Sequence, residues 1–351
     1  MNILDFYKSS EKQDELKALL VLGAQKHPAG LAANFLEKDL WVTEILRLLY
    51  EERLIGDFSI AFKGGTALSK CWKVIERFSE DIDLSIHWVD LAGADDEVEA
   101  WEKTTKNPSQ RKKFQKRQKK LLIEWSQGLV DRLNERFSSY EIDGLIAELE
   151  ADSEGEKIDI HFPRVTAGGA DYQLDYILLE FGGRNRGHPT ESKPIDCYLS
   201  EIPEFSELEF PTATVQAYHP AYVVWEKLTA LHQFSTQSRE PNSNRLARHW
   251  YDVDCILQKK LYDPLGSHDA MTHVVEMKRQ RWHVPGVSFD LVLSGGMQLI
   301  PEAERLAAIA SDHQEAVKGG MFFSEPDSFD VIVGRIKTAQ DHINMMLNSG
   351  R

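Results

Sequence analysis

Residues 62–86 read FKGGTALSKCWKVIERFSEDIDLSI, and the rest of the chain reads as scaffold around them. The apolar run at 59–62 predicts a strand, and Gly64-Gly65-Thr66 is typical of a tight turn. Residues 67–76 carry apolar side chains at helical spacing, which predicts a helix. At 81–86, acidic and aliphatic residues alternate, so a strand there directs both carboxylates to one face and the aliphatic side chains to the other.

Asp81 and Asp83 are the two acids of this second predicted strand. Carboxylates about 7 Å apart along a strand repel each other unless a cation lies between them. Mg²⁺ suits this arrangement, because it takes a few carboxylate oxygens and completes its shell with water and phosphate. Gly64 and Gly65 supply a binding site for the phosphates, since backbone N–H groups can approach an anion closely at a glycine turn that begins a helix. The stretch therefore predicts a nucleoside triphosphate held over magnesium.

Other phosphate-binding and metal-binding motifs are excluded. The sequence contains neither GxxxxGK[ST] nor GxGxxG. An EF-hand is excluded because Ser85 and Ile86 stand where its loop needs a ligand and a glycine. The alternative to a metal–nucleotide site is a structural turn beside two solvated acids.

The turn, the helix and the acid pair together resemble the signature of the polymerase-beta-type nucleotidyltransferases, in the form used by the AbiEii/AbiGii toxin family. The diagnostic residues are Gly64-Gly65-Thr66 and residues 77–84, RFSEDIDL. The resemblance implies an α/β (α+β) nucleotidyltransferase core with a small mixed sheet, followed by a mainly helical carboxy-terminal domain. We expect the core domain at 1–205 and the helical domain at 206–351.

Length and composition agree with a globular protein of two domains. The chain has 351 residues, of which 42% are hydrophobic and 28% charged. No apolar run approaches transmembrane length, and the amino terminus lacks a signal-peptide core, so we expect a cytoplasmic protein without a membrane partner. The three cysteines are widely separated and imply neither a disulfide framework nor a zinc site.

The charge of the chain is uneven. The formal net charge of −15 argues against nonspecific adhesion to nucleic acid. Residues 103–120, however, contain nine basic residues and no acidic one. We interpret this basic island as a contact for acceptor RNA, with Lys112, Lys113, Lys116 and Arg117 as its candidate residues. The alternative is that the island docks on the acidic surface of its own chain.

A third carboxylate is expected on a strand beside the one that holds the acid pair. Residues 157–162 and 173–181 are predicted strands flanking a loop. Glu180 fits best, because it lies near the end of the stronger strand and precedes a loop that contains two arginines. Asp159 and Asp175 are the alternatives.

The second half of the chain contains a second signature. Residues 220–232 predict a helix that contains Glu226-Lys227-Leu228, and a polar loop separates it from residues 245–257. These segments resemble the family's E-K-L helix followed by R-[DH]-x-Y-D. In that resemblance Lys227 neutralises charge on the triphosphate, and Asp252 orients the lysine or the attacking group. The alternative is a lysine at a helix edge and an aspartate in a salt bridge.

Three further positions qualify this resemblance. His249 takes the place of an acid, and Asp254 is an additional acid, so the individual roles of Asp252 and Asp254 stay open. Glu37-Lys38-Asp39 is similar to the E-K-D segment that precedes the glycine turn in the family. Residue type alone favours a surface turn of a packed helix, and Lys38 is a minor candidate only because of its position relative to the glycine turn.

The reaction implied by the resemblance is in-line attack of an acceptor hydroxyl on the α-phosphate of a nucleoside triphosphate, with release of pyrophosphate. Two magnesium ions about 4 Å apart would be held by Asp81 and Asp83, with Glu180 completing the shell of the first. The implied nucleotide-binding residues are Lys63, Gly64, Gly65, Thr66, Ser79 and Lys227, and the implied catalytic residues are Asp81, Asp83, Lys227 and Asp252.

The resemblance also implies the toxin of a toxin–antitoxin or phage-defence pair, with tRNA 3′ ends as the acceptor and a separately encoded antitoxin. Two other classes of function stay open from the residues. The same site could transfer the nucleotide to a protein hydroxyl, or the chain could bind a nucleotide without turnover.

Overall fold

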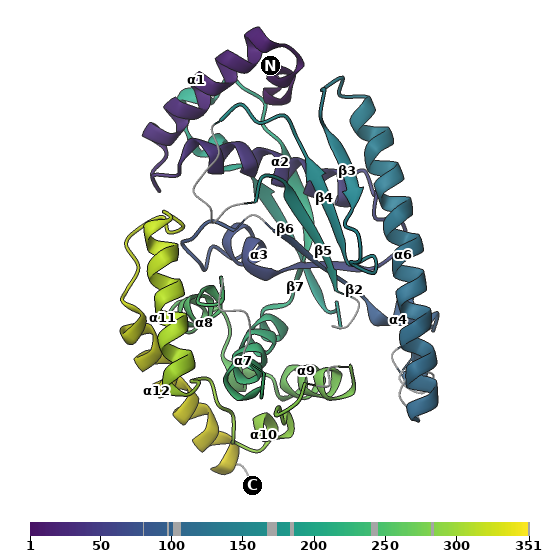
Figure 1. Cartoon of the computed structure of the whole chain (residues 1–351), viewed down its shortest axis with the longest axis vertical. Coiled ribbons are helices and arrows are strands. Elements are labelled where there is room, and N and C mark those ends of the chain that lie inside the picture. The colour runs from purple at the N-terminus through teal and green to yellow at the C-terminus, as the bar shows by residue number, and fades with distance from the viewer. Residues whose placement is uncertain are drawn as a thin grey trace. The chain divides into compact units, whose positions relative to one another are not determined.

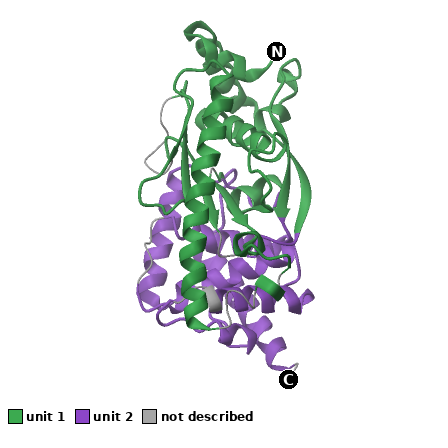
Figure 2. Cartoon of the chain, turned by 90° about the vertical axis from the view of Figure 1, so that its right-hand side faces the viewer, with its two compact units in different colours: residues 1–71, 78–183, 190–217 green, residues 72–77, 184–189, 218–351 purple. Residues whose placement is uncertain are grey.

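A computed structural model describes residues 1–79, 81–96, 98–100, 107–166, 174–182, 186–239, 245–281 and 284–349, with backbone only at 280 and 281. The chain divides into two compact units, coloured green and purple in Figure 2. Unit 1 comprises residues 1–71, 78–183 and 190–217, and unit 2 comprises residues 72–77, 184–189 and 218–351.

Unit 1 combines helices with a mixed sheet (Figure 1). Its described α-helices are α1 (Ser10–Lys26), α2 (Ala33–Tyr50), α3 (Gly64–Lys70), α4 (Trp88–Ala92) and α6 (Pro108–Ser138). Short 3-10 helices span Ile3–Lys8, Tyr198–Glu201 and Pro203–Phe205. The strands are β1 (Ile60–Lys63), β2 (Ile82–Ile86), β3 (Ile146–Leu149), β4 (Lys157–His161), β5 (Ile177–Gly182), β6 (Thr190–Asp196) and β7 (Thr212–Tyr218).

These strands form one seven-stranded sheet in the order β3-β4-β5-β2-β1-β7-β6. β2 is parallel to β5 and β1 is parallel to β7, whereas β1–β2, β4–β5 and β3–β4 are antiparallel. A mixed sheet among helices confirms the predicted α/β class.

The two faces of the sheet differ in polarity because side chains alternate along each strand. Phe62, Leu84 and Phe181 lie side by side on β1, β2 and β5, and all three are buried. Trp125 of α6 packs edge-on against Phe181 with ring centroids 4.8 Å apart, and Figure 1 shows α6 alongside β3. The opposite face carries the acidic residues, as the alternation at 81–86 predicts.

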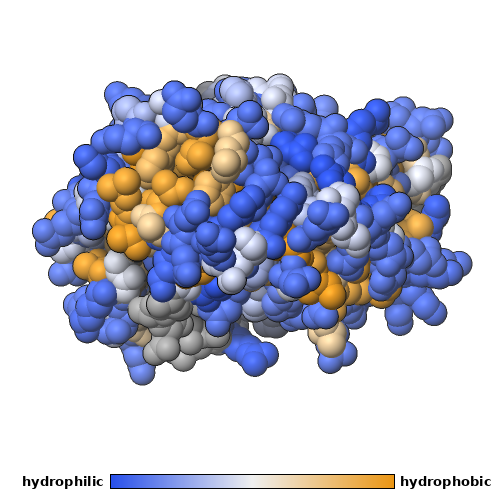
Figure 3. Space-filling model, turned by 90° about the horizontal axis from the view of Figure 1, so that it is seen from above, coloured by the Kyte–Doolittle hydropathy of each residue, from blue (hydrophilic) through white to orange (hydrophobic). Residues whose placement is uncertain are grey.

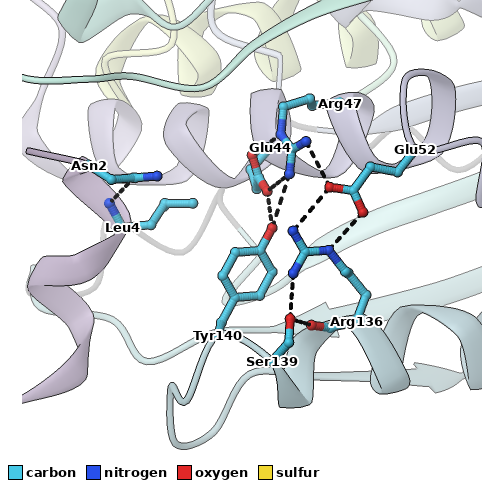
Figure 4. Close-up of polar contacts among 8 residues, drawn as sticks. All are labelled: Asn2, Leu4, Glu44, Arg47, Glu52, Arg136, Ser139 and Tyr140. Carbon is cyan, nitrogen blue, oxygen red and sulfur yellow. Dashed lines mark hydrogen bonds and ion pairs between the residues drawn. The ribbon is translucent and has the colours of Figure 1, made fainter.

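A network of charged side chains joins α2 to α6 (Figure 4). The Arg47 side chain donates to Glu44 and to Glu52, with Nε–Oε2 and Nη1–Oε1 distances of 2.8 Å each. Arg136 Nε donates to Glu52 Oε2 at 2.7 Å, and the Tyr140 hydroxyl donates to Glu44. Arg136 lowers the pKa of the Glu52 carboxyl, with a smaller contribution from Arg47.

Unit 2 is mainly helical, as predicted for the carboxy-terminal part of the chain. Its described helices are α7 (Pro220–Thr236), α8 (Arg248–Gln258), α9 (His268–Arg281), α10 (Asp290–Leu293), α11 (Ala303–Lys318) and α12 (Phe329–Ser349), with a 3-10 helix at Pro264–Gly266. Trp225 and Trp250 are fully buried in this unit, and their indole N–H groups donate to the carbonyls of Pro264 and Leu299. Both indoles are therefore satisfied core side chains.

One predicted element is shorter than expected. The helix predicted over 67–76 ends at Lys70, because Lys73 adopts a left-handed φ of 52° that an α-helix cannot contain. The chain then extends, and Arg77 forms an isolated antiparallel bridge with Phe322. Residues 72–77 belong to unit 2 for this reason.

Figure 3 shows one face of the molecule, where hydrophobic side chains gather in patches among hydrophilic ones. Exposed large apolar side chains include Val21 on α1 and Ile146 on β3. None of the described helices combines the length and the apolar character that crossing a membrane requires.

Candidate active site

The glycine turn and the acid strand fit together at Gly64. Gly64 has φ +74°, in the left-handed region that favours glycine. A Cβ added there would also lie 2.6 Å from Cγ of Asp83, closer than carbon atoms can approach. Glycine is therefore required at this position both for its backbone and for the space that the Asp83 side chain occupies. This contact explains physically why a glycine turn and an acidic strand occur together in the motif.

The hydroxyl of Thr66 ties the turn to the same strand. Thr66 is 1% exposed, and its Oγ1 donates to the backbone carbonyl of Asp81 at 2.5 Å. Ser79 Oγ lies 3.1 Å from the same hydroxyl. A buried hydroxyl with these partners fixes where the acid strand begins. In this structure Thr66 thus holds the position of Asp81.

The register of the sheet places Asp83 in a row of charged residues. Lys63 on β1 and Glu180 on β5 are its direct neighbours on either side. Lys157 on β4 follows beyond Glu180, and its ammonium forms an ion pair with Glu150 at 3.3 Å. All of these side chains project from the acidic face, because direct neighbours in a sheet share a face. Two adjacent acids, Asp83 and Glu180, therefore lie between two lysines across four strands.

The three candidates for the third carboxylate occupy different places. Glu180 is exposed on β5, directly beside Asp83. Asp159 lies one strand further away on β4, opposite Leu178, and burial followed by the nearby Glu150 raises the pKa of its carboxyl. Asp175 precedes β5 and forms an ion pair with Arg164. The register thus brings Glu180, and neither alternative, next to Asp83.

In unit 2 a buried carboxylate holds two cations. Asp252 is 0% exposed and receives hydrogen bonds from Arg77 Nε at 2.8 Å, Arg77 Nη2 at 2.9 Å and Lys227 Nζ at 2.8 Å. Burial acts to raise the pKa of Asp252, but Arg77 and Lys227 outweigh it and hold that pKa well below its usual range. Asp252 is therefore ionised, and it orients the Lys227 ammonium.

Asp254, the additional acid, has a different partner. Arg335 of α12 donates to both of its carboxylate oxygens, at 2.8 and 2.6 Å, and Gln258 Nε2 donates at 2.8 Å. Asp254 thus ties α8 to α12. His249 is kept neutral, because burial and then the neighbouring Lys227 lower the pKa of its imidazole. The two aspartates therefore have different partners. Asp252 binds Arg77 and Lys227, whereas Asp254 binds Arg335.

The EKD segment on α2 is buried, and each of its side chains anchors another part of unit 1. Glu37 accepts backbone N–H groups of Val165 at 2.7 Å and Thr166 at 3.0 Å. Lys38 Nζ donates to the carbonyl of Leu174 at 2.8 Å. Asp39 pairs with Lys70 at 2.5 Å. These contacts are those of a packed helix that positions its neighbours.

Comparison with known proteins identifies the family. A family model described as "Nucleotidyl transferase AbiEii toxin, Type IV TA system" matches residues 47–335. The chain belongs to the AbiEii nucleotidyltransferase toxin family. Among solved structures it is similar to MenT4, a nucleotidyltransferase toxin from Mycobacterium tuberculosis H37Rv, with 17% identity and a TM-score of 0.46 over 94% of this chain and 98% of that chain. No curated protein matches it.

Membership in the AbiEii family confirms the resemblance seen in the sequence. The protein is a nucleotidyltransferase toxin of a type IV toxin–antitoxin system, which implies a nucleoside triphosphate substrate and an antitoxin partner. Of the residues singled out from the sequence, unit 1 holds Lys63, Gly64, Gly65, Thr66, Ser79, Asp81, Asp83 and Glu180, and unit 2 holds Lys227 and Asp252.

Divalent metals are typical of nucleotidyltransferases, and the AbiEii-family chain offers donors that suit one. No group of three or more His, Cys, Asp or Glu side chains converges as a metal site within the described part of the chain. Mg²⁺, however, commonly uses one or two carboxylates and takes its remaining ligands from water and substrate phosphates. Asp81, Asp83 and Glu180 supply only carboxylate oxygens, and Asp83 and Glu180 are direct neighbours on one face of the sheet. This donor set fits Mg²⁺ bound together with a triphosphate.

The basic island lies on the first turns of α6. Lys112, Lys113, Lys116 and Arg117 are exposed, whereas Phe114 on the same turns is buried. Lys103 and Lys106 lie outside the described residues. Lys119 and Lys120 have acidic partners, Glu154 and Glu124, but among the described residues the four candidates form no ion pair. Within the described part of the island, ion pairs with the chain's own acids therefore occur only at its end, at Lys119 and Lys120.

Arg77 is the residue of this AbiEii-family site that the sequence reasoning missed. Its guanidinium is buried and makes a bidentate pair with Asp252, 175 residues further along the chain. A signal was present, because Arg77 opens the RFSEDIDL segment. An arginine is also the residue best suited to bind a carboxylate with two parallel hydrogen bonds.

Proposed function

We propose that this AbiEii-family toxin transfers a nucleoside monophosphate from a nucleoside triphosphate to a hydroxyl of RNA, with a tRNA 3′ end as the acceptor. The main support for this proposal is the packing of Gly64 against Asp83, which lies between Lys63 and Glu180 in the sheet. It supports the proposal because a glycine turn that begins a helix lies directly beside carboxylates suited to magnesium. We also propose that the reaction takes place in the cytoplasm and serves phage defence, under control of the cognate antitoxin.

The proposed reaction is an in-line displacement. The acceptor oxygen attacks the α-phosphorus and forms the new P–O bond, while the bond to the oxygen that bridges the α- and β-phosphorus breaks. Pyrophosphate leaves, and the proton of the hydroxyl passes to solvent. When bound by Asp81, Asp83 and Glu180, magnesium would support ionisation of the hydroxyl and offset charge on the phosphates.

The chain's own residues bind and position the substrate in this proposal. Lys63 and the backbone N–H groups of Gly64 and Gly65 bind the β- and γ-phosphates. Thr66, with Ser79, holds Asp81 in place through the hydrogen bonds described above. Lys227 offsets the charge that develops on the transferred group, and Asp252 keeps its ammonium oriented.

A labelling experiment tests the proposal. The purified protein is incubated with magnesium, total cell RNA and each α-labelled triphosphate in turn, and RNA is expected to carry the label. Asp83→Asn should abolish labelling and leave the fold intact, because removing one charge from a repelling pair rarely destabilises a protein. Asp57→Asn, at a fully exposed aspartate of the same unit, is the matched control and should label RNA normally.

The outcomes separate the three classes of function. Label on protein would replace the RNA acceptor by a protein hydroxyl, and nucleotide binding without release of pyrophosphate would leave a binding module. Normal turnover of Asp83→Asn at saturating magnesium would refute the proposed metal site.

The same assay tests the third carboxylate. Glu180→Gln is expected to reduce labelling strongly, whereas Asp159→Asn and Asp175→Asn should retain it. Mn²⁺ binding followed by electron paramagnetic resonance gives a readout that does not depend on turnover. It should weaken in Glu180→Gln alone of these three variants.

A further inference from the structure

The exposed cations at the start of α6 form one continuous stripe. Asn107 caps the helix by accepting the N–H of Gln110 at 2.9 Å, and Pro108 follows at the first position, so the helix is well defined where the stripe begins. Phe114, Gln118 and Leu122 are buried along one side. At 100° per residue, Lys112 and Lys116 fall on the opposite side, with Lys113 and Arg117 beside them. The stripe therefore faces solvent along about 7.5 Å of helix, from Lys112 to Arg117, since each residue advances 1.5 Å.

The described part of unit 1 gives the charges of this stripe no acidic partner. Lys112, Lys113, Lys116 and Arg117 are exposed and, within the described ranges, make no ion pair. Residues 108–120 contain no acid. Four like charges on two helical turns repel one another, and this repulsion is relieved when a polyanion binds. In a chain of net charge −15, such a local concentration of positive charge indicates a specific anionic partner.

The composition of the stripe indicates which part of a nucleic acid it contacts. Between Asn107 and Glu124 the exposed face offers no aromatic side chain, because Phe114, the one aromatic residue there, is buried. Proteins that hold single strands stack bases on aromatic side chains, whereas double-helical RNA is bound through its phosphates and its shape. Lysine and arginine side chains at this spacing suit phosphates, and contacts to phosphates carry no sequence information directly.

We infer that the stripe of Lys112, Lys113, Lys116 and Arg117 binds the phosphate backbone of a double-helical stem in the acceptor RNA. The inference rests on the proposed function for the identity of the RNA as the acceptor. It assigns to α6 the positioning of the RNA body, while the reacting end is bound elsewhere.

The test uses the full chain without nucleotide, so that binding is measured separately from transfer. One probe is an RNA hairpin with a single-stranded 3′ extension, and the other is the extension alone. In the stripe variant all four residues are changed to glutamine. In the matched control Lys12, Lys17, Lys260 and Lys337, which are exposed and have no ion pair within the described structure, are changed to glutamine. Both variants remove the same net charge.

The stripe variant should bind the hairpin more weakly than the control does. The slope of log affinity against log salt should be smaller by about 3, because each lost phosphate contact removes about 0.7–0.9. Binding of the single-stranded extension should be equal in the two variants, and both should unfold at the same urea midpoint.

Several results would overturn the inference. These are an unchanged salt slope for the hairpin, an equal loss for the single-stranded probe, or loss of antitoxin binding with normal RNA binding. The outcome is distinguishable from failure of the proposed function. A reduced salt slope without any nucleotide transfer would support RNA binding by the stripe and refute the proposed reaction. Transfer to RNA with an unchanged slope would support the reaction and refute RNA binding by the stripe.

Discussion

Substitution of Gly64 by alanine tests whether the contact between the glycine turn and Asp83 sets the geometry of the site. The added Cβ would lie 2.6 Å from Cγ of Asp83, whereas carbon atoms in contact are about 3.5–4.0 Å apart. The Asp83 carboxylate must therefore move by about 1 Å. A displacement of that size at a reacting group costs about 100-fold in rate, or about 2.7 kcal/mol of transition-state stabilisation.

The same substitution also strains the backbone, and this effect can be measured separately. An L-residue in the left-handed region costs about 1–2 kcal/mol of folding free energy. Gly56 is a matched control, because its φ is +73° and a Cβ there would meet nothing within 4 Å. Gly56→Ala should therefore lose stability in urea by a similar amount and retain its activity.

The assay is incorporation of α-labelled nucleotide into RNA at saturating substrate, with urea unfolding of each variant measured in parallel. Gly64→Ala should lose about 100-fold in kcat, whereas Gly56→Ala should keep most of the wild-type kcat. Equal activity of the two alanine variants would show that the carboxylate tolerates the displacement. The reasoning from packing to catalysis would then be wrong.

Three further predictions concern the charged side chains of both units. Asp252→Asn should lower the free energy of unfolding by about 3–5 kcal/mol in urea, since it leaves the buried Arg77 and the partly exposed Lys227 without a full counter-charge; a loss under 1 kcal/mol would contradict this. Lys227→Ala should reduce kcat by the equivalent of about 2–4 kcal/mol and change the nucleotide KM less. A change in KM alone would show that Lys227 binds the ground state and the transition state equally. Because Arg136 lowers the pKa of Glu52, the ionised Glu52 stabilises the fold above its unfolded pKa of about 4.3, and this contribution disappears as the pH falls through the lower folded pKa. Glu52→Gln should therefore unfold at lower urea than the wild type at pH 7, and the difference should shrink below about pH 4.3; a difference independent of pH would exclude the ion pair as its cause.

The sequence by itself determined the local elements and the family. The alternation at 81–86 indicated which face of the strand carries the acids, because side chains alternate along any strand, and the pattern at 220–232 located α7. The combination of glycine turn and acid pair was specific enough to indicate the AbiEii family, which the family match confirms. The roles of individual site residues stay predictions.

Only the tertiary structure decided which residues meet. Periodicity could not show that Glu180 pairs with Asp83, because strand register depends on burial of the whole apolar face and not on either residue. The end of α3 at Lys70 was missed for a related reason, since residues 72–77 gain their partners from unit 2, through the bridge of Arg77 to Phe322. Arg77 with Asp252 and Asp254 with Arg335 are separated by 175 and 81 residues. Such pairs form because a buried charge must find its counter-charge in the folded chain, and nothing in the local sequence states where that partner will lie.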